Sequence, residues 1–336
     1  MNNRVHSLDF LRGLMAFMIM VYHYTSWSMG GFWGQRFVVV FGVYGVAIFY
    51  VLSGLTLYLV YQDRLKFATL PRYFIKRVLR IFPLLWLAIF LTVFALDKGH
   101  STRTILLNLS GLFGFVDYNN SIAIGSWSIG NELVYYSLFP LVVWLGKRMR
   151  FGLELSFLIA VILGGWFAFG RLSPDDTLHN QWGIYVHPFN HLFLFVGGML
   201  LGKYGHYVKG KRTAEVLIGF SLLFYVLYPL PDRVHLATGF TRVIYSCSAM
   251  ALTLGFYRLK IPLVSGPLKG LSFLGKVSYS VYLLHPIVFF LGAYLVNRRL
   301  YPLSYILVSM IATFFVSWIV YEQFEKRFIG LGKKWS

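Results

Sequence analysis

The sequence predicts an all-α polytopic membrane protein with about ten transmembrane helices. Of its 336 residues, 57% are hydrophobic and only 13% are charged, and the mean hydropathy is +0.64. Soluble domains rarely have such a composition. Apolar runs of about 18–25 residues recur along the whole chain, and each is long enough to cross a hydrocarbon core of about 30 Å as a helix.

Ten apolar runs define the expected spans, and the basic residues define their direction. The runs are 8–27, 37–61, 81–96, 127–146, 152–169, 189–204, 214–230, 237–257, 271–296 and 303–323. With the N-terminus inside, most of the 31 Lys and Arg residues fall in cytoplasmic segments, which predicts that both termini are cytoplasmic. No repeat or linker divides the chain, so we expect one membrane domain over 1–336 without a soluble appended domain.

The apolar segment 104–126 does not fit this series of spans. It is interrupted by Gly111, Gly114 and a polar patch. If it crossed the membrane, Lys147 and Arg148 would lie outside and every later loop would be inverted. We therefore predict an interfacial or re-entrant segment that packs against protein.

The formal net charge of +19 raises the question of a nucleic-acid partner. Basic residues in membrane proteins mark cytoplasmic loops, so the charge predicts contact with the lipid bilayer and not with nucleic acid. Cys247 is the single cysteine, which excludes an internal disulfide and argues against a thiolate metal site. No metal is predicted.

The first span carries charged and titratable groups. Asp9 and Arg12 lie at its start and His23 lies deep inside it. Eleven residues of helix make three turns plus about 20°, with a rise of about 16 Å, so Arg12 and His23 share one face. An ionisable group within a membrane is a candidate functional residue. The alternative is a topology anchor at Arg12 and an interhelical hydrogen bond at His23.

Two further spans carry polar stripes at helical spacing. These are Ser128, Glu132 and Tyr136 in the fourth span and Ser278, Tyr282 and His285 in the ninth. Counted from the span ends, His23, Glu132 and His285 lie at similar depth in the outer half. Two histidines and a carboxylate at one depth favour a catalytic site over simple polar contacts between helices.

A dense basic segment precedes the third span. Arg77 and Arg80 are three residues apart, which suits bidentate binding of phosphate groups. Pro83 is expected in the first turn of the following helix. The alternative is an anchor that contacts anionic lipid headgroups. The second span carries Ser53 together with Gly42, Gly45 and Gly54, a pattern that also fits close packing of helices.

These residues together resemble the acyltransferase-3 family of integral membrane acyltransferases. The resemblance rests on Arg12 with ten residues before His23, "FYVLSG" at 49–54, "RVLRIFP" at 77–83, "WSIGNELVYY" at 127–136 and "SYSVYLLHP" at 278–286. It covers nearly the whole chain. The family implies ten core helices and transfer of an acyl group from cytoplasmic acyl-CoA, usually acetyl-CoA, to a carbohydrate hydroxyl at the outer face. It also implies that Arg12 and His23 form a functional pair and that Arg77 and Arg80 serve the donor.

The expected mechanism combines the resemblance with the chemistry of the residues. His23 is the expected general base, with Glu132 orienting it. Tyr136, Tyr282 or His285 would donate to the oxyanion. Arg12, Arg77, Arg80 and Ser53 are the expected acyl-CoA contacts. Trp127, His187, Asn190 and His191 are the expected acceptor contacts. An acyl-histidine relay is an open alternative to direct transfer.

Other classes of protein are also compatible with charged intramembrane residues. A transporter or flippase for a lipid-linked glycan would line its path with them, but no inverted repeat is detectable. A scaffold would leave the basic segment unexplained. The preferred interpretation is a polysaccharide O-acetyltransferase in the cytoplasmic (inner) membrane of a bacterium, and glycan-synthesis machinery is its expected partner.

Overall fold

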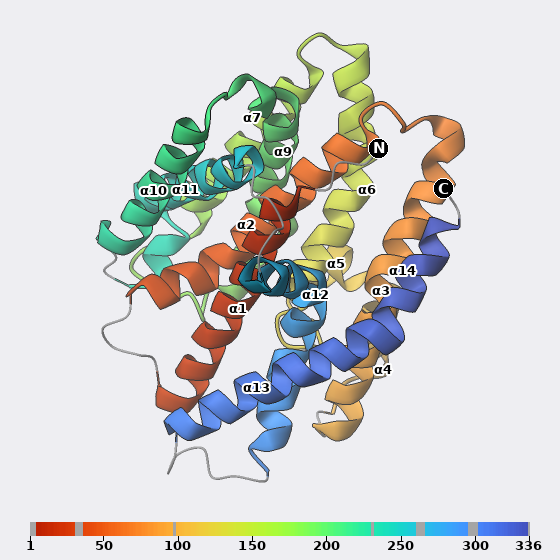
Figure 1. The fold of residues 1–336 in the computed structure, drawn as a ribbon, viewed down its shortest axis with the longest axis vertical. Coiled ribbons are helices and arrows are strands. Elements are labelled where there is room, and N and C mark those ends of the chain that lie inside the picture. The colour runs from red at the N-terminus through yellow and green to blue at the C-terminus, as the bar shows by residue number, and fades with distance from the viewer. Residues whose placement is uncertain are drawn as a thin grey trace.

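The computed structural model describes residues 5–30, 36–96, 99–229, 232–259, 266–294 and 302–334. All regular structure in these ranges is helical (Figure 1). The longer helices are α1 His6–Met29, α2 Arg36–Tyr61, α3 Leu70–Ala95, α6 Trp127–Arg148, α7 Gly152–Trp166, α9 Pro188–Tyr204, α10 Lys211–Leu227, α11 Gly239–Arg258, α12 Gly266–Gly292 and α13 Pro302–Val320. Each of them overlaps one predicted span.

Six helical stretches within the described residues are long and apolar enough to cross a membrane. They are Phe37–Tyr61, Phe67–Ala95, Gly152–Arg171, Trp182–Tyr207, Ser272–Gly292 and Pro302–Lys333. The remaining long helices, α1, α6, α10 and α11, do not meet that measure of length and hydropathy. Three of them carry a charged residue among their apolar ones, namely Arg12 in α1, Glu132 in α6 and Arg242 in the first turn of α11. The total of ten crossings and the sidedness of the termini stay predictions.

Two close helix pairs form the centre of the bundle. Helix α1 packs along α12, and α2 packs along α9. A Cβ atom at Gly54 would overlap the carbonyl oxygen of Phe195, and one at Gly275 would overlap the carbonyl oxygen of Asp9. Glycine at these two positions therefore allows the backbones to touch, as in other small-residue interfaces between membrane helices.

Helix α3 begins earlier than predicted. The expected span started at residue 81 with Pro83 in its first turn, whereas the helix starts at Leu70 and Pro83 lies in its interior. The prediction was wrong because the basic segment is itself helical and buries Tyr73 against the bundle. Pro71 is the proline at the helix start, where a missing N–H has no effect.

The segment 104–126 contains no long helix. It holds most of α4, Thr102–Ser110, and all of α5, Phe113–Val116, which have nine and four residues. Asn108 is fully buried, donates to the carbonyl oxygens of Thr104 and Asn120, and accepts the N–H of Ile122. Neither helix is long enough to span a bilayer, and the chain is bonded to protein here, as a re-entrant or interfacial segment requires.

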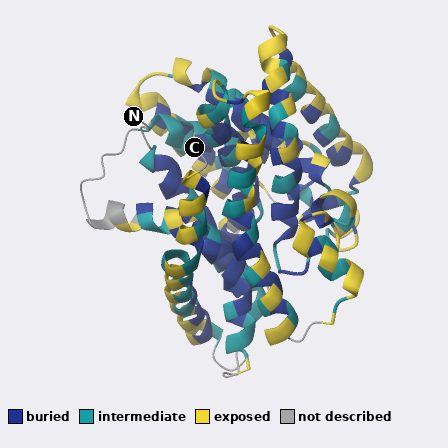
Figure 2. Cartoon of the chain, turned by 90° about the vertical axis from the view of Figure 1, so that its right-hand side faces the viewer, coloured by how far each residue is buried: buried dark blue, intermediate teal, exposed yellow. Residues whose placement is uncertain are grey.

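The surface of the bundle is apolar over several outer helices. Figure 2 shows buried residues along its centre and exposed residues on the outward faces. Phe90, Phe94, Phe240 and Ile311 are more than half exposed. Such broad apolar exposure suits a lipid environment.

Candidate active site

A cavity of about 430 Å³ lies within the bundle. Its walls come from α1, α2, α3, α6 and α12, and from the C-terminal segment that includes the π-helical turn Tyr321–Glu325 and α14, Lys326–Lys333. Seven predicted site residues line it, namely Arg12, Ser53, Arg77, Arg80, Glu132, Tyr136 and Tyr282. The structure therefore brings the predicted donor contacts together with part of the predicted catalytic set.

One part of the cavity wall is strongly basic. Besides the three arginines it includes Lys276 and Lys333, which the sequence analysis did not select. The carboxylates in the lining are Asp9 and Glu132. The Arg12 guanidinium lies 3.6 Å from Asp9 and donates to the Thr56 hydroxyl at 3.0 Å. This excess of cations favours a ligand with several negative charges.

Arg80 has a protein partner that the sequence did not reveal. Its guanidinium forms an ion pair with Glu325, whose carboxylate is buried and also accepts the Ser280 hydroxyl at 2.6 Å. The π-helical turn at the end of α13 brings Glu325 to this position. The charge of Arg80 is thus largely neutralised within the protein. The prediction had been that Arg77 and Arg80 bind phosphate groups together.

Arg77 has no such carboxylate partner among the described residues. Its guanidinium carbon lies 5.9 Å from the ring centroids of both Tyr61 and Tyr136. Its Nε is buried and makes no hydrogen bond within the described part of the chain. Aromatic faces hold a guanidinium in place without cancelling its charge, so Arg77 is the arginine of the pair best placed to receive an anion.

Glu132 belongs to a hydrogen-bonded group on the cavity wall. The Ser53 hydroxyl donates to its carboxylate at 2.5 Å, and the Tyr136 hydroxyl lies 3.2 Å from that of Ser53. Arg12 and Arg80 interact electrostatically with the same carboxylate. The structure places Glu132 with these groups and gives no hydrogen bond between it and His23. The expected orientation of His23 by Glu132 has no support in this geometry.

His23 instead contacts His285. The His23 Nδ1 and His285 Nε2 atoms are 2.8 Å apart, and His285 Nδ1 lies 3.0 Å from the Val281 carbonyl oxygen. A carbonyl only accepts, so a neutral His285 carries its proton on Nδ1 and accepts on Nε2. His23 must then donate from Nδ1, which leaves a lone pair on its Nε2. The tautomers of both histidines follow from these two hydrogen bonds.

Trp27 completes this pair. Its ring stacks on His23, with centroids 4.9 Å apart and planes within 11°, and it also lies parallel to His285. Trp27 is not among the predicted site residues, although it lies four residues after His23 on the same helix face. The Tyr22 ring also contacts His23, with centroids 5.2 Å apart, and Arg233 is placed over the Tyr22 ring at 5.5 Å.

Tyr282 connects the cavity with the histidine pair. Its side chain lines the cavity, and its ring centroid is 6.2 Å from that of His285. Its hydroxyl donates to the Gly125 carbonyl at 2.9 Å and lies 2.7 Å from the Ser128 hydroxyl. Tyr282 and His285 both use their donors within the protein, so neither has a free donor for an oxyanion in this arrangement.

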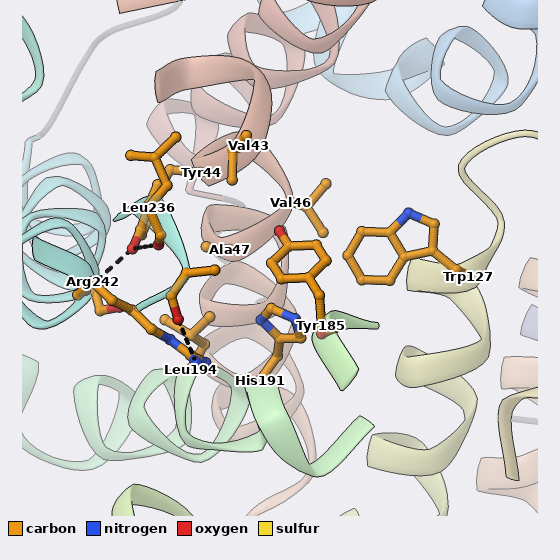
Figure 3. A pocket seen from close by; sticks show the side chains of 12 residues that line it. Val43, Tyr44, Val46, Ala47, Trp127, Tyr185, His191, Leu194, Leu236 and Arg242 are labelled. Carbon is orange, nitrogen blue, oxygen red and sulfur yellow. Dashed lines mark hydrogen bonds between the residues drawn. The ribbon is translucent and has the colours of Figure 1, made fainter. Parts of the chain in front are cut away.

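The four predicted acceptor residues lie in different places. Trp127 and His191 line a small pocket (Figure 3). His187 lines a separate cavity of about 660 Å³. Asn190 is fully buried and donates to the Tyr185 carbonyl at 2.7 Å. Over the part of the chain that the structure covers, no group of three His, Cys, Asp or Glu side chains could hold a metal ion.

Fold and site together define a polytopic, integral membrane protein with a polar, cationic cavity inside its helix bundle. The family model described as the acyltransferase domain, acyltransferase-3, matches residues 5–322. The chain therefore belongs to the acyltransferase-3 family.

Two curated relatives are similar over much of the chain. Nodulation protein 10 of Rhizobium leguminosarum bv. viciae is 24% identical over 244 residues, which cover 63% of this chain and 63% of that protein. "Putative acetyltransferase ORF330" of Acidianus two-tailed virus is 27% identical over 265 residues, 73% of this chain and 72% of the relative. The chain thus aligns with less than two thirds of nodulation protein 10. No solved structure matches the chain significantly.

Proposed function

We propose that this protein transfers an acetyl or other short acyl group from cytoplasmic acyl-CoA to a hydroxyl group of a cell-surface or lipid-linked carbohydrate. The family and the name of the viral relative support acyl transfer. The proposal places the protein in the inner membrane of a bacterium, where it would act beside glycan-synthesis machinery. Acetyl-CoA is the proposed donor and no metal takes part.

The observation that carries the proposal is the basic cavity lined by Tyr282, whose ring centroid is 6.2 Å from that of His285 in the histidine pair. Coenzyme A carries several phosphate charges on one end and its thioester on a slender arm. Arg77, Arg12 and the two cavity lysines offer cations to the phosphates. Arg12 and His23 are separated by about 16 Å of helix rise, a length that the arm of the donor can bridge.

The proposed chemistry assigns the base to His23 Nε2. The acceptor hydroxyl gives its proton to this nitrogen while its oxygen attacks the thioester carbonyl carbon. The carbon–sulfur bond then breaks, the acyl group stays on the acceptor oxygen, and the proton passes to the departing thiolate of coenzyme A. His285 accepts from His23 Nδ1 and keeps the ring in the required tautomer.

A binding and turnover measurement on the purified protein tests the proposal. Labelled acetyl-CoA should bind and lose its acetyl group in the presence of a carbohydrate extract. Acetyl-pantetheine, which lacks the nucleotide phosphates, should bind at least about 10-fold more weakly, because it cannot use the charge-assisted contacts. Equal binding of both compounds, or no binding of acetyl-CoA, contradicts the proposal and leaves a glycan transporter as the alternative.

A further inference from the structure

A second cavity lies apart from the active-site cavity, and the proposed mechanism does not use it. Its volume is about 660 Å³, which is within the range of about 300–1,000 Å³ that is usual for ligand sites. Its walls come from the end of α7 with the π-helical turn Phe167–Arg171, from the chain just after α5, and from the segment that leads into α9. None of its lining residues in the described chain also lines the active-site cavity. This space is therefore a separate site with room for a ligand.

The loop that forms one wall of this cavity is fixed by its own hydrogen bonds. Gln181 is buried, accepts the N–H of Ser173 at 2.7 Å, and donates to the carbonyl oxygens of Ser173 and Asp176 at 2.9 and 3.2 Å. The Asp176 carboxylate accepts from the Asn180 side chain at 2.7 Å. Because the wall is ordered before any ligand arrives, binding costs little conformational entropy there.

Three polar side chains that line the cavity keep hydrogen-bonding capacity for a ligand. His187 Nδ1 accepts the N–H of Phe189 at 3.2 Å, so a neutral His187 carries its proton on Nε2, and this donor has no partner in the described ranges. The Arg171 guanidinium and the Asn119 amide likewise make no hydrogen bond or ion pair with the residues that the structure covers. A Cβ atom at Gly183 would lie 2.6 Å from Asn119 Nδ2, so glycine at this position leaves room for the amide.

Aromatic rings supply the rest of the binding surface. Trp166 is 54% exposed even though the Arg171 guanidinium lies 5.4 Å from its ring centroid, so part of its surface is open. Tyr118 and Phe189 also line the cavity, and each contacts the His187 ring. A sugar ring presents C–H groups on its faces, which pack on aromatic rings, and hydroxyls at its rim, which need donors and acceptors. Open aromatic surface beside amide, imidazole and guanidinium groups therefore matches a saccharide.

The charge of the cavity does not favour a ligand that carries many negative charges. Arg171 is the one Lys or Arg in the lining, and no carboxylate lines the cavity within the described residues. The active-site cavity, by contrast, is lined by three arginines and two lysines. A polyanion is thus better served by the active-site cavity. A saccharide is favoured here over a lipid headgroup, which would depend on the charge of Arg171.

The cavity is close to the active-site cavity on the predicted outer side. The segment 170–188, which forms much of its wall, faces outside in the predicted topology. Trp182 of this segment contacts Trp127, with ring centroids 5.6 Å apart, and the next residue of α6, Ser128, lines the active-site cavity. The two spaces are thus neighbours without a common lining residue in the described chain. A saccharide that fills one of them while its hydroxyl reacts in the other must contain several sugar units.

We propose that this second cavity is a glycan-binding site, which holds an oligosaccharide of the acceptor beside the active site. The inference rests on the proposed function, because it makes the acceptor a chain of several sugars. Trp166 packs against a sugar ring, while the Arg171, Asn119 and His187 side chains bind hydroxyl groups.

Binding of glycans to the purified protein, without an acyl donor, tests the proposal. The protein in lipid nanodiscs is applied to a printed array of bacterial oligosaccharides and their constituent monosaccharides. At least one oligosaccharide should bind, and its monosaccharides should bind at least about 10-fold more weakly, because they make fewer contacts. No binding of any oligosaccharide, or equal binding of an oligosaccharide and its monosaccharides, would overturn the proposal. Competition by glycerol 1-phosphate as strong as by the free oligosaccharide would assign the cavity to lipid headgroups and would also overturn it.

Two matched variants locate the binding. Trp166→Leu removes the ring but keeps an apolar side chain, and binding of the oligosaccharide should weaken at least about 10-fold. In acetyl transfer, the KM for this oligosaccharide should rise by a similar factor. Trp144→Leu is the control, because Trp144 is 56% exposed on α6 and lines neither cavity.

Equal binding by the two variants would place the glycan elsewhere on the protein and overturn the assignment to this cavity. Since the array contains no acyl donor, failure of the binding test is separable from failure of acyl transfer.

Discussion

Arg77 and Arg80 lie one helical turn apart on α3, and the fold gives them different partners. Arg80 pairs with the buried carboxylate of Glu325, whereas Arg77 is held between two aromatic rings with its Nε unpaired. Breaking an ion pair that has one buried member is destabilising mainly because the buried charge is left without an opposite charge. Arg80 is therefore expected to act on stability and Arg77 on ligand binding.

We expect Arg80→Ala to lower the free energy of unfolding by about 2 kcal/mol. This is less than the ~3–5 kcal/mol of a fully buried pair, because the Arg80 side chain is 35% exposed. Adding Glu325→Gln should restore part of the loss, since it removes the orphaned charge. Thermal unfolding in detergent measures both variants. A double variant that is less stable than Arg80→Ala would show that the ion pair is not the cause.

We expect Arg77→Ala to weaken acetyl-CoA binding by about 1.5–3 kcal/mol, the range for a hydrogen bond to a charged group. Its stability should change little, because no carboxylate in the described residues depends on it. Equilibrium binding of acetyl-CoA measures the effect. Arg72→Ala is a suitable control, because this residue of the same helix does not line the cavity. Equal affinity of the two variants would return Arg77 to the role of a topology anchor.

At the scale of the helices, contact between α1 and α12 holds the histidine pair together. His23 comes from α1 and His285 from α12, and the backbones touch at Gly275. Because helices are rigid over this length, a change in their separation at one point changes the distance between side chains further along.

Gly275→Ala should therefore reduce both stability and acyl transfer. The added Cβ overlaps the Asp9 backbone, which cannot move as a side-chain end could, and overpacking of this kind typically destabilises by about 1–3 kcal/mol. Gly270→Ala on the same helix is the control, since a Cβ there meets nothing within 4 Å and alanine favours a helix. If the two variants behave alike in unfolding and transfer, close contact at Gly275 is unimportant.

Helix positions were predictable from the sequence because hydropathy and helical periodicity are properties of consecutive residues within one segment. Each long helix overlaps an apolar run, and the shared face of Arg12 and His23 follows from helix geometry alone. The start of α3 was missed because its first turns are amphipathic and basic, so hydropathy hides them.

Partners across helices were less predictable. Similar depth suggested that Glu132 would meet His23, but depth does not fix the rotation or the neighbour of a helix. The fold places Ser53 beside Glu132 and His285 beside His23. Glu325 and Arg242 were likewise hidden, because their partners arise from a π-helical turn and from backbone carbonyls. Such contacts have no signature in composition or spacing.

At the scale of the whole molecule, the distribution of basic residues predicts the sidedness. The segment 62–80 should be cytoplasmic and the segment 170–188 should face outside. Lys66 and Asp175 are exposed residues in these segments. In a Cys247→Ser background, Lys66→Cys should react with a membrane-impermeant maleimide only after the membrane is opened, whereas Asp175→Cys should react in intact cells. The reverse pattern would invert the topology and place the basic cavity away from cytoplasmic acyl-CoA.

In the proposed mechanism the basic cavity binds the donor, and His23, which lies outside the cavity lining, performs the chemistry. The most direct test measures acetyl-CoA binding and acetyl transfer side by side for His23→Ala. We expect donor affinity within about 2-fold of the unmodified protein and a loss of transfer of at least about 10²-fold, the scale of a general base. Substantial transfer by a well-folded His23→Ala protein would contradict the account and leave His23 as a hydrogen-bonded contact between helices.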